Sequence, residues 1–175
     1  FAADEDNKAI AALENALNSN LTSAGNHSSV GVLLLSNGYY LPANKAFAKA
    51  IELSADLPSQ EVAEFYNGLG ASLLHLDHLQ EAEAAFLKAS VLAEDNWQSH
   101  YNIAVINAKL GNGERALTAL RESIERGASI QSVLTVGRHL EHFNMQPLYQ
   151  QLLKRTNLTG EEQRKLQSRV INQPN

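Results

Sequence analysis

The chain of 175 residues contains no cysteine, only 4 prolines and 6% aromatic residues. The absence of cysteine excludes disulfides, thiolate nucleophiles and cysteine-ligated metals. Scarce proline combined with abundant alanine and leucine favours helices, because alanine loses no side-chain entropy in a helix and leucine loses little. No apolar run approaches the roughly 20 residues that a helix needs to cross a membrane. We therefore expect no membrane span.

The net charge of −5 argues against a nucleic-acid-binding surface spread over the whole chain, so we expect no nucleic-acid partner. The charge is uneven, because residues 129–175 carry six Lys and Arg side chains against three Glu. This basic end either steers a partner or is an ordinary solvated helix surface.

The first residues, Phe1-Ala2-Ala3 ahead of Asp4, have the small-residue pattern of a signal-peptidase site. The pattern favours an exported or periplasmic protein over a cytoplasmic one. Alternatively, the sequence starts at Phe1 because the chain was truncated at that residue for convenience.

Small and bulky side chains recur at a fixed interval of 34 residues along the chain. They are Gly70, Ala82, Phe86 and Ala89, followed by Ala104, Ala116, Leu120 and Ser123. A period of this size indicates a stack of similar small units. The small residues permit close helix packing, and Phe86, Tyr66, Phe47 and Leu120 are expected to fill the remaining space. Gly38 and Gly111 are expected to adopt positive φ at turns between helices.

Tyr66, the Leu69-Gly70 pair and a turn at Asp77 complete a pattern that resembles the tetratricopeptide repeat, a helix–turn–helix unit. The resemblance implies an all-α fold: an α–α superhelix, or solenoid, of about four helical hairpins with a C-terminal capping helix. We expect a single domain over residues 1–175. Its parts are a half or degenerate unit over 3–20, units over about 24–57, 63–96 and 97–130, a degenerate unit over 130–156, and the capping helix over 159–171. The connection after the first full unit is five residues longer than the period, and Pro58 is expected to end the helix there.

Histidine pairs are the main candidates for chemistry. His75 and His78, and likewise His139 and His142, are spaced i, i+3, which differs from the i, i+4 spacing of zinc proteases. A third metal ligand cannot be named from sequence, and neither a nucleophile elbow nor a phosphate-binding glycine loop is present. We expect no metal, no cofactor and no enzymatic activity.

The resemblance further implies that a ligand lies along the inner faces of the first helices. The residues carried over to those faces are Asn67, Leu74, His75, Gln98, Tyr101, Asn102, Val105, Lys109 and Arg138. Asn102 stands where family members often grip a peptide backbone, since an amide donates and accepts at once. Tyr101 is the expected anchor. Alternatively, Tyr101 packs between hairpins and Asn102 caps a neighbouring element.

The chain is therefore expected to be a non-enzymatic scaffold that binds a peptide or partner protein in a concave groove, in a bacterial envelope or multiprotein assembly. The clamp that binds chaperone tails is disfavoured, because only Asn102 fits it. Two alternatives stay open: a self-associating structural protein that forms a homo-oligomer, and a regulatory domain of a larger protein.

Overall fold

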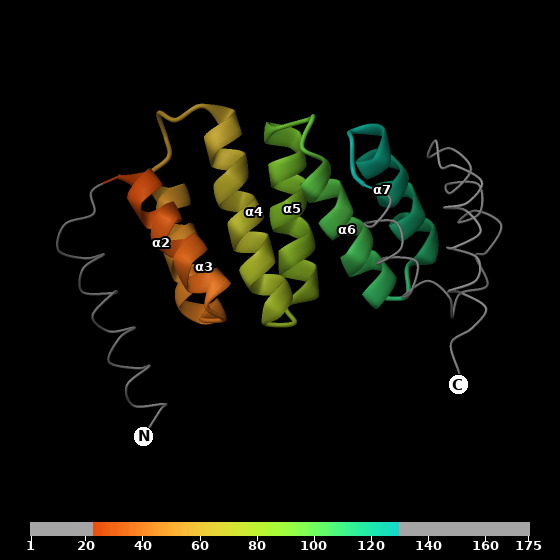
Figure 1. The fold of residues 1–175 in the computed structure, drawn as a ribbon, viewed down its shortest axis with the longest axis horizontal. Coiled ribbons are helices and arrows are strands. Elements are labelled where there is room, and N and C mark those ends of the chain that lie inside the picture. Colours follow the sequence, from red (N-terminus) through yellow and green to blue (C-terminus); the bar gives the residue numbers. More distant parts are fainter. Residues whose placement is uncertain (1–22, 130–175) are drawn as a thin grey trace, which may run out of the picture. The chain divides into compact units, whose positions relative to one another are not determined.

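A computed structural model describes residues 23–129, which form six helices and no strand (Figure 1). The helices are α2 (Ala24–Ser36), α3 (Tyr40–Glu52), α4 (Ser59–His75), α5 (Leu79–Leu92), α6 (Trp97–Lys109) and α7 (Gly113–Glu125). The predicted all-α repeat fold is confirmed. The expected units over 3–20 and 130–156 and the capping helix over 159–171 lie outside the described residues. None of the described helices combines the length and the apolar character that crossing a membrane requires.

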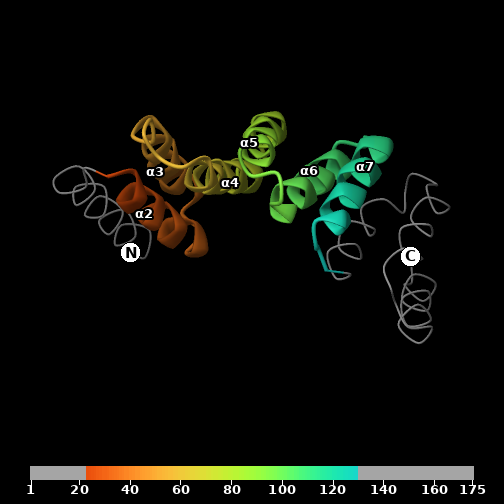
Figure 2. The same ribbon diagram turned by 90° about the horizontal axis from the view of Figure 1, so that it is seen from above.

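The chain divides between Glu94 and Asp95 into two compact units. Within residues 23–129, the first unit contains the hairpins α2/α3 and α4/α5, and the second contains the hairpin α6/α7. Figure 2 shows α3 and α5 nearly end-on, whereas α2, α6 and α7 run obliquely in this view. The long connection that the sequence predicts lies between α3 and α4, where Pro58 is the residue directly before α4.

Each hairpin turns through one residue with positive φ. Gly38, Asp77 and Gly111 have φ of 82°, 62° and 80°. The residue after each of them donates its backbone N–H to a carbonyl five residues back, which closes the end of the first helix. These bonds are Tyr39 to Leu34 at 2.9 Å, His78 to Leu73 at 2.9 Å and Asn112 to Asn107 at 2.8 Å. The predicted conformation of Gly38 and Gly111 is confirmed.

The core of the first unit depends on phenylalanine rings pressed onto glycines. Phe47 on α3 is only 1% exposed, and its ring meets Gly31 on α2 and Gly68 on α4. A Cβ atom on Gly31 would lie 2.9 Å from the ring, and one on Gly68 would lie only 2.3 Å from it. Phe47 therefore joins two hairpins, because α2 and α3 belong to one hairpin and α4 belongs to the next.

The same pairing of a small and a large residue, 16 positions apart, recurs along the chain. Phe86 meets Gly70, where a Cβ atom would lie 2.9 Å from the ring. In the second unit the corresponding residues are Ala104 and Leu120, and both are fully buried. Alanine thus stands in place of glycine, which adds a methyl group, and leucine stands in place of the larger phenylalanine.

Replacement of Gly68 by alanine tests the contact between hairpins. We expect Gly68→Ala to lower the free energy of unfolding by about 1–3 kcal/mol, because the buried Phe47 ring has little room to retreat. Gly25→Ala is the control: nothing lies within 4 Å of the added Cβ atom, and Gly25 is also in a helix. That variant is expected to be neutral or slightly stabilised. Urea unfolding measures both, and equal stabilities for the two variants would contradict the packing described.

The turn geometry gives a second prediction. Gly111→Ala is expected to lower the free energy of unfolding by roughly 1–2 kcal/mol, because a side chain is strained in the left-handed region. Asp77→Gly places glycine in the same conformation and is expected not to destabilise the chain. Thermal unfolding followed by circular dichroism compares the two, and a loss of stability in Asp77→Gly would be the contrary result.

Candidate partner-binding faces

The sequence-predicted contact residues of the second unit lie along one side of α6. They are Gln98, Tyr101, Asn102, Val105 and Lys109, and we call this set the open face of α6. Their helical spacing of i, i+3, i+4, i+7 and i+11 brings all five to one side. The remaining sides bury Ser99, His100, Ile103, Ala104, Ile106, Asn107 and Ala108. Three members of the open face are half-buried, while Gln98 and Lys109 are exposed.

The start of α6 holds this face in place. The side-chain oxygen of Asn96 accepts hydrogen bonds from the backbone N–H groups of Gln98 and Ser99, at 3.0 and 3.2 Å. This cap fixes the first turn of the helix. Trp97 then lies edge-to-face with Tyr101, with ring centroids 6.3 Å apart and an interplanar angle of 63°. The Tyr101 ring is thus held by a neighbouring aromatic ring while part of it stays accessible.

The predicted residues on α4 share one side of that helix in the same way. Asn67 and Leu74 are half-buried, and His75 is exposed at the end of the helix. The His75 ring stacks on Tyr40 of α3, with centroids 4.3 Å apart and planes at 2°. Beside this stack, Asn44 of α3 donates a hydrogen bond to Ser72 at 3.3 Å.

Tyr40 and Asn44 were missed by the sequence reasoning, which assigned contacts to the first helices alone. No local signal reveals them, because each touches a residue about 30 positions further along the chain. Arg138, the last predicted contact residue, lies outside the described residues. The sharing of one groove by the faces of α4 and α6 stays a prediction.

An open hollow of about 540 Å³ lies between α4 and α5. It is lined by Val62, Tyr66, Leu87, Lys88, Val91 and Leu92. The Lys88 ammonium lies 5.3 Å from the centroid of the Tyr66 ring, a cation–π contact. Tyr66 was expected to fill space between helices, and it does pack against Ala63 of α4 and Ala89 of α5, while its half-buried ring also borders this hollow. Leu87 and Val91, which are 46% and 76% exposed, could have been found by their i, i+4 spacing on the side of α5 away from its buried residues.

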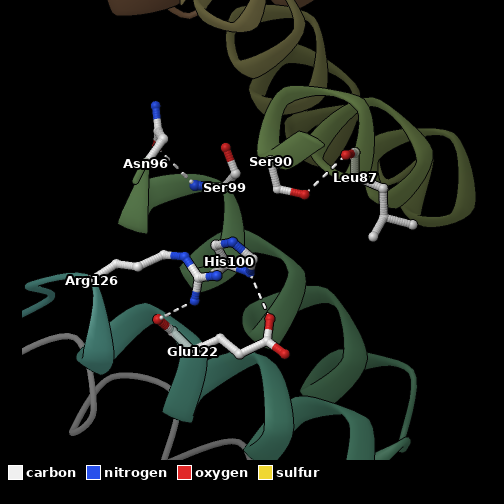
Figure 3. Close-up of polar contacts among 7 residues, drawn as sticks. All are labelled: Leu87, Ser90, Asn96, Ser99, His100, Glu122 and Arg126. Atoms are coloured by element: carbon white, nitrogen blue, oxygen red, sulfur yellow. Dashed lines mark hydrogen bonds and ion pairs between the residues drawn. The ribbon is translucent and has the colours of Figure 1, made fainter. Parts of the chain in front are cut away.

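A polar contact between the buried His100 and the partly exposed Glu122 joins the two helices of the second unit (Figure 3). His100 of α6 points toward α7, and its Nδ1 lies 2.9 Å from Oε2 of Glu122. Arg126 donates from Nη1 to the Glu122 backbone carbonyl at 3.0 Å. Burial lowers the pKa of His100 below its ordinary value of 6.5, Arg126 lowers it further, and Glu122 acts in the opposite direction.

Of the two histidine pairs that the sequence offers as candidate metal ligands, the structure describes one, His75 and His78. Within residues 23–129, no group of three or more potential ligands could hold a metal ion. His75 stacks on Tyr40, whereas Nδ1 of His78 lies 3.4 Å from Oε1 of Glu81 on the surface. The second pair, His139 and His142, lies outside the described residues.

Comparison with known proteins agrees with this architecture. No protein-family model matches the chain. The chain is 34% identical over 61 residues to human tetratricopeptide repeat protein 8, a match that covers 35% of this chain and 11% of the human protein. The chain thus spans only about a tenth of that relative's length.

Two solved structures share the fold. The crystal structure of MamA superimposes with a TM-score of 0.69 and 21% identity, covering 83% of each chain. PilF of Pseudomonas aeruginosa gives a TM-score of 0.64 and 20% identity, covering 90% of this chain and 71% of PilF. These matches show that the chain shares the all-α fold of the two proteins, built from helical hairpins.

Proposed function

We propose that this protein is a protein-interaction scaffold that binds an extended peptide segment of a partner protein on its first helices. The observation that carries the proposal is the open face of α6. The fully buried residues of α6 all lie on its other sides, and none of the five residues of the open face is among them. A mixed surface of this kind is typical of peptide recognition, in which an aromatic anchor is combined with groups that bond the backbone.

Each part of the open face has a role in this proposal. The half-buried ring of Tyr101 supplies apolar contact area at a low entropy cost, because Trp97 already restrains it. The Asn102 amide offers one donor group and one acceptor to the N–H and C=O groups of an extended chain. Lys109 adds a positive charge at the far end of the helix, which favours a peptide with a carboxylate at that position.

A screen of the full chain against a phage-displayed library of random linear peptides tests the proposal. The affinities of selected peptides are then measured by fluorescence polarisation for the native protein and for Tyr101→Ala/Asn102→Ala. We expect the double variant to bind about thirtyfold more weakly, a loss of about 2 kcal/mol. The matched control is Arg121→Ala/Glu125→Ala, which changes two exposed residues on α7 and is expected to bind normally. Undiminished binding by the Tyr101/Asn102 variant would reject the assignment of this face.

Self-association is a second candidate function, and the hollow between α4 and α5 favours it. Val91 is 76% exposed, and monomeric proteins rarely leave large contiguous apolar surfaces open. Val91→Glu is expected to lower the apparent mass in a light-scattering concentration series, with Lys49→Glu as the control on the exposed side of α3. A native protein that remains monomeric at high concentration would remove this candidate.

The bacterial envelope setting and the alternative of a regulatory domain within a larger protein both stay predictions from the sequence. Neither changes the test above, because the open face of α6 belongs to this chain in either case.

A further inference from the structure

The second unit contains one buried titratable side chain that the proposed function leaves unused. His100 is only 8% exposed, although its neighbours Tyr101 and Asn102 belong to the open face of α6. Its contact with Glu122, at 2.9 Å, ties α6 to α7 on the opposite side of the same helical turn (Figure 3).

The geometry defines where the proton of a neutral His100 resides. Nδ1 carries the proton and donates to the Glu122 carboxylate, so Nε2 is the unprotonated nitrogen. Nε2 is buried and has no hydrogen-bond partner in the part of the chain that the structure describes. A second proton would therefore create an N–H donor with no described acceptor, which is costly in a buried site.

The charges around the ring act against each other. The charged groups that influence His100 within residues 23–129 are Glu122 and Arg126, and both are on α7. Glu122 favours the imidazolium, whereas Arg126 and the loss of water disfavour it. Burial is the largest of these effects, so the neutral ring is the form that fits the folded hairpin.

We propose that His100 and Glu122 form an acid-sensitive latch: the neutral His100 ring, bonded to the Glu122 carboxylate, holds α6 against α7, and a second proton on His100 loosens the hairpin and displaces the open face. Control of partner binding by this latch rests on the proposed function. The latch itself does not, because it concerns only the packing of α6 on α7.

The direction of the pH dependence follows from the pKa of His100, which is lower in the folded chain than the 6.5 of a free histidine. The unfolded chain then takes up a proton more readily than the folded chain does. The stabilisation is complete above pH 6.5 and is lost as the pH falls below 6.5 toward the folded pKa.

Two measurements on the full chain test the latch. An NMR titration of the His100 ring gives its pKa in the native protein directly, and we expect a value below 6.5. Urea unfolding between pH 7.5 and pH 5 is compared for the native chain and for His100→Gln, which keeps a donor but does not titrate. Each unit by which folding lowers the pKa corresponds to about a tenfold increase in the unfolding constant at acid pH. We expect that increase to be absent from His100→Gln.

His78→Gln is the matched control for these experiments. His78 also lies near a glutamate, at 3.4 Å from Glu81, but its side chain is 54% exposed. His78 lies directly before α5 and takes no part in the α6/α7 hairpin, so this variant should keep the loss of stability at acid pH that the latch predicts.

Trp97 reports whether the latch reaches the open face. It is the chain's single tryptophan and contacts Tyr101 in the first turn of α6. We expect its fluorescence emission to change on acidification with the midpoint of the His100 titration, and to stay constant in His100→Gln. A His100 pKa at or above 6.5, or the same pH response in His100→Gln as in the native chain, would overturn the latch. Neither result depends on a partner, so failure of the latch is distinguishable from failure of the proposed function.

Discussion

The close approach of a phenylalanine ring to a glycine backbone is the contact on which the first unit depends. Phe47 fills the space left by Gly31 within its own hairpin and by Gly68 on the following one. Phe86 repeats the arrangement against Gly70. Because interiors pack as densely as crystals, the missing side chains are a requirement for this geometry. The rings then determine how closely the helices approach and which helix side each hairpin buries.

The side of α6 that is buried determines which of its side chains remain accessible to a partner. The buried residues of α6, His100 among them, lie on its other sides, and the open face, which includes Tyr101, contributes none of them. Under the proposed function, a partner binds one side of α6 while the buried residues on its other sides stabilise the chain. The link from His100 to Glu122 connects these two sides, since a change in how α6 packs must also move the residues that it presents.

The sequence predicts the contacts that follow from the repeat, and it misses contacts that depend on how helices distant in the sequence pack against each other. Phe86 and the turn at Gly111 follow from period and residue type alone, and both predictions agree with the structure. Gly68 lies outside the repeat pattern, and its contact with Phe47 spans 21 residues. The stack of Tyr40 on the end of α4 likewise depends on how one hairpin meets the next. The burial of His100 had a signal, because it shares helical spacing with the buried side of α6. No sequence signal predicted its pairing with Glu122 on α7.

A large side chain at one position of each pair requires a small residue at the other. The chain itself contains both versions of this pairing, which supplies the variants for a test. The second unit carries Ala104 and Leu120 where the first carries Gly70 and Phe86. A double-mutant cycle by urea unfolding would compare Gly70→Ala, Phe86→Leu and the combined variant. If the ring requires the glycine, the combined variant loses less stability than the sum of the single changes, by about 1 kcal/mol or more. Strictly additive losses would show that the two positions do not depend on each other, and would contradict the account.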